Sequence, residues 1–303
     1  MGFGIRRVLR ERPDALVQVF SCLPSYITFA SLLAARRTGH PLVWYPSMHP
    51  ARRAMWSGGG LQRGMRVFDR IAPRAARHVD AVAVNTEVEA DYFRTLGARH
   101  VEVLPPAVAD DPVLPAAAAD AFRARLGIGA APLVVIVALR AERRKGLDYA
   151  LASFREVRRE LPSARLVVVG IDGAPAEGVE YAGRVSDDDL VAALRTADVV
   201  FVPSLYEAFS RIVIEAWQQA TPVVVTSGVA LAPTVAEAGG PVVPYGDVHN
   251  ASTELARLLA DPAAARQLGV VGRGLVEERF VLPVVLERYE DLYRRLRRRR
   301  APR

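Results

Sequence analysis

Lysine and cysteine are almost absent from this 303-residue chain. The single cysteine, Cys22, excludes an internal disulfide and a cysteine-rich zinc site, and it agrees with a reducing, cytoplasmic environment. Lys145 is the one lysine, so arginine supplies nearly all the positive charge behind the net value of +7. Arginine abundance alone is therefore weak support for a nucleic-acid partner, and the position of the isolated lysine becomes informative.

A long uninterrupted apolar run is also missing near the N-terminus. Residues Ala15–Ala35 are fairly apolar, but Gln18, Ser21 and Pro24 interrupt them, and a spanning helix needs about 20 consecutive apolar residues without a breaker. A strand, a loop and a helix fit this segment better than a signal peptide or a membrane span. Basic patches interleaved with aromatic residues are lacking too, which argues against nucleic-acid binding.

Hydrophobic runs suited to strands alternate with helical patterns along the whole chain. In the first half we expect strands over residues 15–20, 42–45, 81–84 and 101–104, with helices over 26–37, 65–77 and 87–96. In the second half we expect strands over 132–139, 164–170, 179–183, 198–204 and 222–226, with helices over 116–127, 147–160, 187–197, 209–220, 233–239, 252–268 and 284–300. Such alternation predicts parallel sheets with helices on both faces.

A change of composition divides the chain. Residues 105–131 are rich in proline and alanine, as linkers often are. We therefore predict an N-terminal domain over residues 1–115, a C-terminal domain over 116–283, and a final helix with a basic tail over 284–303.

Charged side chains follow several strands of the second half. Arg140 and Lys145 come after the strand at 132–139, and Glu207 comes after the strand at 198–204. Ligands of open parallel sheets bind beyond the carboxyl ends of the strands, so these groups should meet at one rim. Taken singly, the two cations could be solvated loop charges, and Glu207 could be a helix cap.

A second carboxylate, Glu215, lies eight residues after Glu207 within an apolar helical run. It belongs either to a solvated helix face or to a ligand site. Free amides at Phe209–Arg211, where the helix should open, favour a phosphate, and the nearby cations could neutralise a diphosphate. Carboxylates accept hydrogen bonds from sugar hydroxyls, so the joint pattern describes a site for a nucleotide sugar.

The segment PSLYEAFSRIVIEAWQQATPVVVT resembles the E-x7-E region of the family 4 retaining glycosyltransferases. Further resemblance lies in ALRAERRKGLDYALASF, in VEYAGRVSDDDLVAALRTADVVFVPS and in the C-terminal segments GGPVVPYGD and DPAAARQLGVVGRGLVEERF. The similarity runs from Ala15 to the C-terminus and is strongest from Leu133 to Leu296. It implies the GT-B fold, in which two doubly wound Rossmann-like domains face a cleft.

The resemblance also implies roles for individual residues. Glu207 would meet the hydroxyls of the donor sugar, Glu215 would meet the nucleotide ribose, and His49 resembles a histidine near the reaction centre. The remaining donor-binding set holds the diphosphate or flanks the base, and it consists of Arg140, Lys145, Phe209, Ser210, Arg211 and Ile212, with Gly183, Arg184 and Val185 beside the base.

Two departures from the family pattern stand out. The usual E-G-F-G is EAFS here, so Ser210 replaces a glycine, which is tolerable if its φ is negative. The family's N-terminal domain usually begins with a strand and a Gly-Gly loop, which we do not find. SGGGLQRG follows a later strand, so we expect the N-terminal domain to be incomplete.

The implied activity is transfer of a sugar, with retention, from a nucleoside-diphosphate sugar to a glycan or lipid-linked acceptor. No cofactor and no metal are expected, since Asp187–Asp189 fits a helix start better than a metal site. Two alternatives remain open, a non-catalytic sugar-nucleotide-binding or partner subunit and a sugar-nucleotide epimerase.

The tail RRLRRRRAPR is either a solvated end or a peripheral contact with anionic lipid at the inner face of the membrane.

Overall fold

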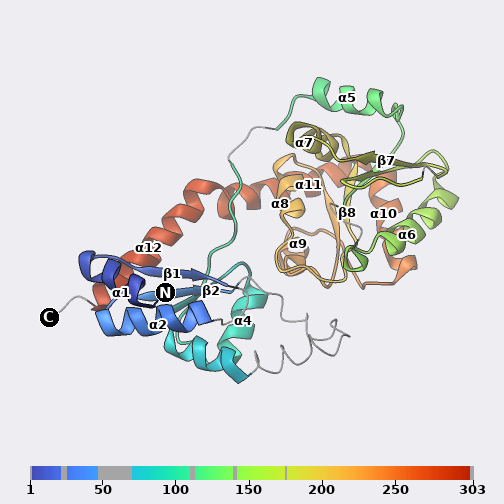
Figure 1. Ribbon diagram of the computed structural model, residues 1–303. Coiled ribbons are helices and arrows are strands. Elements are labelled where there is room, and N and C mark those ends of the chain that lie inside the picture. The colour runs from blue at the N-terminus through green and yellow to red at the C-terminus, as the bar shows by residue number, and fades with distance from the viewer. Residues whose placement is uncertain are drawn as a thin grey trace. The chain divides into compact units, whose positions relative to one another are not determined.

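The computed structural model describes residues 2–21, 26–46, 70–109, 113–138, 142–174 and 176–300. The chain forms two compact α/β units (Figure 1). Unit 1 comprises Met1–Pro106 and Pro283–Arg303, and unit 2 comprises Ala107–Leu282. The sheets of both units are parallel throughout, as the alternation of strands and helices predicts.

Unit 1 contains a four-stranded sheet in the order β1-β2-β3-β4. Its strands are β1 (Val17–Phe20), β2 (Leu42–Tyr45), β3 (Ala81–Val84) and β4 (Val101–Val103), and its helices include α1 (Gly2–Glu11), α2 (Tyr26–Thr38) and α4 (Glu87–Thr95), with residues 70–78 also helical. All four predicted strands are present. Helix α1 was not predicted, although its pattern is amphipathic, with Leu9 buried and Arg10 exposed.

The last helix, α12 (Leu282–Arg300), belongs to unit 1. Leu292 and Leu296 are buried in a cluster with Val43 and Tyr45 of β2. Burial, together with the neighbouring Tyr289, raises the pKa of the Tyr45 phenol far above its usual value. The boundary between the units therefore falls at Pro106 and not at residue 115, and α12 does not form a separate segment as the sequence-based division placed it, because its apolar face completes the core of unit 1.

Unit 2 contains a six-stranded sheet in the order β10-β9-β8-β5-β6-β7. Its strands are β5 (Leu133–Val137), β6 (Arg165–Val169), β7 (Val179–Gly183), β8 (Val199–Val202), β9 (Val223–Thr226) and β10 (Val242–Val243). Its helical elements are α5 (Ala116–Arg125), η2 (Arg143–Lys145), α6 (Leu147–Glu160), α7 (Asp187–Thr196), α8 (Arg211–Gln218), α9 (Ala232–Glu237), α10 (Val248–Ala260) and α11 (Pro262–Arg279).

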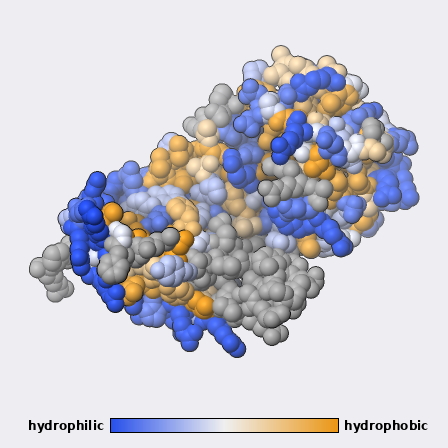
Figure 2. All heavy atoms as spheres, viewed as in Figure 1, coloured by the Kyte–Doolittle hydropathy of each residue, from blue (hydrophilic) through white to orange (hydrophobic). Residues whose placement is uncertain are grey.

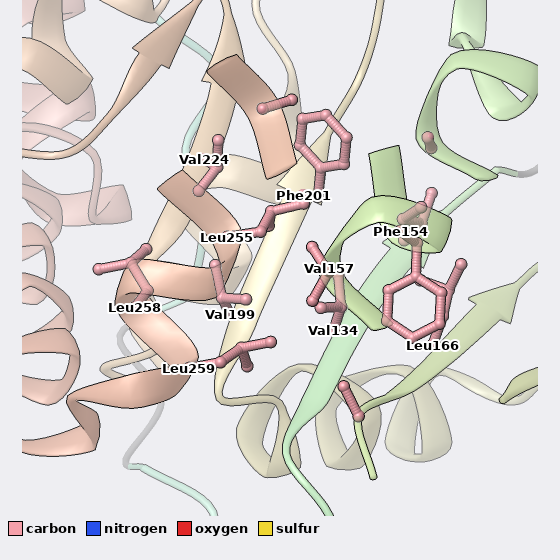
Figure 3. Close-up of a cluster of buried hydrophobic side chains, with 14 of the residues drawn as sticks. Val134, Phe154, Val157, Leu166, Val199, Phe201, Val224, Leu255, Leu258 and Leu259 are labelled. Carbon is pink, nitrogen blue, oxygen red and sulfur yellow. The ribbon is translucent and has the colours of Figure 1, made fainter. Parts of the chain in front are cut away.

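The core of unit 2 explains why its strands are near-continuous apolar runs. Strands covered on both faces lose the alternation of polar and apolar residues, and every residue of β8 and β9 is buried. On one face, side chains of α6 and α10 pack against the central strands (Figure 3), and the residues in contact include Phe154, Val157, Leu255, Leu258 and Leu259 from the helices with Val134, Val199 and Phe201 from the strands. This rigid layer fixes the loops that follow β5 and β8.

One predicted helix is wrong. Instead of a single helix over 252–268, α10 ends at Ala260 and α11 begins at Pro262. The Asp261 carboxylate accepts a hydrogen bond from the amide of Ala264 at 3.0 Å, so Asp261 caps α11. Proline at the first helical position starts a helix but cannot continue one, so the Asp-Pro pair carried the signal that the sequence prediction missed.

The surface of unit 2 mixes hydrophilic and hydrophobic residues on the face drawn in Figure 2. Among the described residues, no helix combines the length and the apolar character needed to cross a membrane.

Candidate functional site

The loops after β5 and β8 lie at the point where the strand order of unit 2 reverses. The chain runs from β5 outward to β6 and β7, then returns to place β8 on the other side of β5. Such a switch point leaves a crevice at the carboxyl ends of the two strands, where ligands bind in this class of sheet. Lys145 follows β5 and Glu207 follows β8, so the topology places both at this crevice.

Two backbone contacts lock the loops together. The amide of Leu205 donates to the carbonyl of Arg144 at 2.8 Å. Gly146, with a φ of +69°, lies against the carbonyl of Pro203 so closely that an added Cβ would be 1.9 Å from that oxygen. Gly146 follows the last residue of η2 and precedes the first residue of α6. Because glycine has no Cβ, the β8 loop can lie directly against it at this turn. The position of Lys145 relative to Glu207 is therefore set by backbone, not by flexible side chains.

Lys145 and Glu207 form an ion pair between Nζ and Oε1. The Lys145 side chain is 24% exposed and the Glu207 side chain is 10% exposed. Ser204, itself buried, donates from Oγ to the same Oε1 at 3.0 Å, and its carbonyl accepts a hydrogen bond from the Thr226 hydroxyl. Sequence reasoning missed Ser204 and Thr226, although both stand at the carboxyl ends of strands, where the same rule would have selected them.

The backbone of Glu207 is anchored to the loop after β9. Its amide donates to Gly228 O at 3.1 Å, and its carbonyl accepts from the Ala230 amide at 2.9 Å. These bonds make a short parallel bridge between Glu207 and Val229. The carboxylate is consequently held on a fixed frame, which suits a residue that must orient a ligand.

Helix α8 begins at Arg211, one residue after Ser210. The amides of Phe209 and Ser210 thus precede the helix, whereas those of Arg211 and Ile212 lie in its first turn. The Phe209 ring packs edge-on against Phe280 with centroids 5.9 Å apart, which leaves only its backbone for a ligand. The N-terminus of α8 remains a place where amides and the helix dipole favour an anion.

A serine is tolerated at position 210 if its φ is negative, and Ser210 does not meet this condition. Its φ is +71°, in the left-handed region, and its buried Oγ has no hydrogen-bond partner among the described residues. A left-handed conformation costs a residue with a Cβ about 1–2 kcal/mol, and a buried hydroxyl without a partner adds to that cost. A glycine at this position would avoid both costs, so Ser210 introduces local strain.

Replacement of Ser210 by glycine should stabilise unit 2. We expect a gain of about 1 kcal/mol, because relief of strain and of the unpaired hydroxyl exceeds the extra entropy that glycine gives the unfolded chain. Thermal unfolding should shift upward by about 2–4 °C. Ser210→Ala removes only the hydroxyl, and Ala220→Gly, at a φ of +55°, measures relief of strain alone. A lower melting temperature for Ser210→Gly would contradict the strain argument.

Glu215 lies one turn into α8, with its side chain 20% exposed. Its Oε1 is 3.0 Å from an Arg211 guanidinium nitrogen. Burial raises the pKa of the Glu215 carboxyl, the positive charge and hydrogen bond of Arg211 oppose this, and Asp187 adds a small rise, so the pKa lies above its usual value. A half-desolvated carboxylate on the helix that carries the anion-favouring N-terminus is placed to accept hydrogen bonds from a ligand.

The raised pKa of Glu215 predicts a pH-dependent effect of Glu215→Gln. The carboxyl adds stability below its unfolded pKa of about 4.3, and that contribution is lost as the pH rises through the higher folded pKa. The variant should therefore melt above the wild type near pH 7.5 and approach it near pH 4. Glu277→Gln removes a carboxylate that is 53% exposed and also pairs with an arginine four residues away, so it should not show this pattern. Equal shifts for both variants at each pH would count against desolvation as the cause.

Gly183, Arg184 and Val185 lie at the carboxyl end of β7. Gly183 has a φ of +62°, and an added Cβ would lie 2.7 Å from a carboxylate oxygen of Asp172. Arg184 is exposed and Val185 is half-buried. Since β6 separates β7 from β5, these residues share the rim with Lys145 but not its immediate surroundings.

His49 and Arg140 lie outside the described residues, so their predicted roles stay predictions. The three aspartates at 187–189 open α7, where Ser186 Oγ accepts the Asp189 amide at 3.1 Å, as the helix-start interpretation predicts. In the described part of the chain, no group of three or more His, Cys, Asp or Glu side chains could hold a metal ion.

A cavity of about 530 Å³ lies between the second half of α6 and the start of β7, lined by Arg155, Arg158, Tyr181 and six other residues. It contains none of the predicted residues.

Comparison with solved structures defines the class of fold. A sucrose-phosphate synthase from Thermosynechococcus elongatus superposes with a TM-score of 0.75 at 24% identity over 97% of this chain and 77% of its own. The Anabaena protein HepE in complex with UDP gives a TM-score of 0.75 at 16% identity over 96% of this chain and 81% of its own. The fold is therefore GT-B.

Sequence comparison then gives the family. The model of the glycosyl transferases group 1 matches residues 119–274, and that of the glycosyl transferase 4-like domain matches residues 2–107. The chain belongs to the glycosyl transferases group 1, within glycosyltransferase family 4.

Curated relatives carry more than one substrate name. A D-inositol 3-phosphate glycosyltransferase from Segniliparus rotundus is 33% identical over 213 residues, which is 64% of this chain and 47% of the relative. A GDP-mannose-dependent alpha-(1-6)-phosphatidylinositol monomannoside mannosyltransferase from Mycolicibacterium smegmatis is 32% identical over 196 residues, 57% of this chain and 50% of the relative. The chain thus spans about half the length of these two relatives.

Proposed function

We propose that this chain transfers a sugar from a nucleoside-diphosphate sugar to an acceptor, with retention of the anomeric configuration and without a bound metal. The observation that carries the proposal is the meeting of Lys145 and Glu207 at the switch point of unit 2. A cation for a diphosphate and a carboxylate for hydroxyls stand in contact on loops whose backbones are fixed to one another. The family membership and the UDP named for HepE agree with such a donor.

The donor would lie across the carboxyl ends of β5 and β8. Lys145 and the first-turn amides of α8 would hold the diphosphate, joined by Arg140. Glu207 would accept hydrogen bonds from the sugar and Glu215 from the ribose, with Gly183, Arg184 and Val185 beside the base. Each group then meets a part of the donor that matches its charge and hydrogen-bonding capacity.

The chemical task of this arrangement is to stabilise the departing diphosphate. As the bond between the anomeric carbon and the diphosphate oxygen breaks, negative charge grows on that oxygen and positive charge grows on the sugar ring. Fixed donors aimed at the developing negative charge lower the barrier because they need no reorganisation. The acceptor hydroxyl attacks from the face that the diphosphate leaves and gives its proton to the departing diphosphate oxygen, and His49 is proposed to lie near this centre.

The acceptor is proposed to be a glycan or a lipid-linked molecule. Phosphatidylinositol monomannoside in the name of one relative suggests the lipid-linked kind. The basic residues at the end of α12 would then serve a protein that works in the cytoplasm and touches anionic lipid at the inner face of the membrane, since each basic residue near such a surface contributes about 1 kcal/mol.

A two-stage experiment tests the proposal. Thermal unfolding with UDP, GDP and ADP identifies the base, since a ligand that binds the folded chain raises the melting temperature. Consumption of the matching sugar nucleotide is then measured with and without a lipid extract that supplies acceptors. Consumption that needs acceptor supports transfer, and epimerised or hydrolysed donor without acceptor supports the epimerase alternative. Binding without any consumption indicates a sugar-nucleotide-binding subunit, and no binding of any nucleotide rejects the donor site.

A further inference from the structure

We infer that Glu207 holds Lys145 in the free protein and gives it up to the donor diphosphate, so that the ion pair makes the site prefer a sugar nucleotide over the spent nucleoside diphosphate. This inference rests on the proposed function. It assigns the Lys145–Glu207 contact a part in choosing between substrate and product, beyond the separate roles of the two side chains.

The contact is a built feature of the free protein, not a chance meeting on the surface. Both side chains are largely buried, at 24% and 10% exposure, so each needs its partner more than a solvated charge would. Their backbones cannot drift apart, because the turn that carries Lys145 is bonded to the β8 loop through Arg144 and Leu205. The ammonium therefore neutralises the carboxylate whenever the site contains only water.

A ligand with both a diphosphate and a sugar can replace this pair without leaving either charge unmatched. The diphosphate oxygens take the ammonium, and the sugar hydroxyls donate to the carboxylate. The hydrogen bond from Ser204 to Oε1 does not involve Lys145, so Ser204 would be a positioning residue that holds Glu207 in place while Lys145 turns away.

A nucleoside diphosphate alone offers only half of the exchange. If Lys145 turns to the diphosphate, the Glu207 carboxylate loses its cation and finds no sugar hydroxyl, which is costly in a partly buried place. If Lys145 stays with Glu207, the diphosphate loses a strong charge-assisted bond. Either outcome weakens retention of the spent nucleotide, which favours its release after transfer.

The test is a double-mutant cycle on nucleotide affinity. Dissociation constants for the base identified by thermal unfolding are measured by calorimetry, with the nucleoside diphosphate and with its sugar nucleotide, for the wild type, Glu207→Gln, Lys145→Met and the double variant. Glu207→Gln should bind the diphosphate about tenfold more tightly than the wild type, because Lys145 is then free. The same variant should bind the sugar nucleotide no more tightly than the wild type, so the preference for the sugar nucleotide falls about tenfold or more.

The decisive arm is the double variant. In the Lys145→Met background the gain from Glu207→Gln should vanish, because there is no ammonium to release. A gain that persists without Lys145 would show that Glu207 acts only as a negative charge near the phosphate, and the inference would be overturned. An unchanged preference in Glu207→Gln would also overturn it while leaving the donor site intact. Failure of every nucleotide to bind both the wild type and Glu207→Gln would instead reject the proposed function and this inference together.

The variant Ser204→Ala tests whether Ser204 positions the Glu207 carboxylate or has only a general structural role. It should weaken binding of the sugar nucleotide while leaving that of the nucleoside diphosphate within about twofold, because only the sugar meets Glu207. Equal weakening for both ligands would point to a general structural role for Ser204 and contradict its positioning role.

Discussion

Lys145→Met should reduce kcat/KM for sugar transfer by about 100- to 1000-fold, a loss of about 3–4 kcal/mol of transition-state stabilisation. The chain contains no second lysine, and Lys145 is held at the switch point by the Glu207 carboxylate. Charge on the leaving diphosphate grows as the reaction proceeds, so the loss should lie mainly in kcat. Steady-state kinetics with the donor identified by binding measures the effect.

Two controls sharpen this expectation. Arg155→Met removes one positive charge from α6 at an exposed position outside the candidate site, and its kcat/KM should stay within about twofold of the wild type. Lys145→Arg keeps the charge but places a planar guanidinium where a compact ammonium stood, so it should recover only part of the activity. Wild-type rates for Lys145→Met would remove this residue from the mechanism.

Gly146→Ala should destabilise unit 2 by about 2–4 kcal/mol and lower its melting temperature by about 5–15 °C. The added Cβ would lie 1.9 Å from Pro203 O and 2.9 Å from Pro203 C, at a φ of +69°. Both obstacles are backbone atoms, so relief requires the β5 and β8 loops to move apart. Calorimetry or circular dichroism measures the change.

Gly127→Ala provides a matched control. Gly127 has a φ of +64°, but no atom lies within 4 Å of the position of an added Cβ. It should cost only the left-handed strain, about 1–2 kcal/mol. Equal destabilisation by the two variants would mean that contact between the loops contributes nothing to stability. At temperatures where it is fully folded, Gly146→Ala should also bind the sugar nucleotide more weakly, since the loop movement leaves Lys145 and Glu207 too far apart to hold one donor together.

Much of the fold could be predicted because burial leaves a direct mark on sequence. Strands such as Leu133–Val137 and Val199–Val202 are apolar along their whole length, as strands covered on both faces must be. The failures fall where local signals compete. Helix α1 lies in a basic N-terminal segment whose amphipathic pattern was not recognised. The break between α10 and α11 is indicated by only two residues, Asp261 and Pro262, within an otherwise helical pattern.

The residues of the candidate site could be predicted from the sequence, but most of their contacts could not. Lys145, Glu207 and Glu215 could be selected from the sequence because each follows or enters an element at a place where parallel sheets bind ligands. Sequence could not show that Lys145 and Glu207 neutralise each other, that Glu215 pairs with Arg211, or that Ser210 adopts a positive φ. Those are properties of side-chain distances and backbone angles between segments far apart in the chain.

The sequence by itself determined the alternation of strands and helices, the parallel sheets and the kinds of charged groups at the ends of β5 and β8, because hydrophobic periodicity and residue type are local properties. Only the tertiary structure decided which strands are neighbours, that α12 completes unit 1, and that one lysine meets one glutamate across two loops. The physical reason is that contact between distant segments depends on the order of strands and on close packing, and neither is encoded in any single stretch of residues.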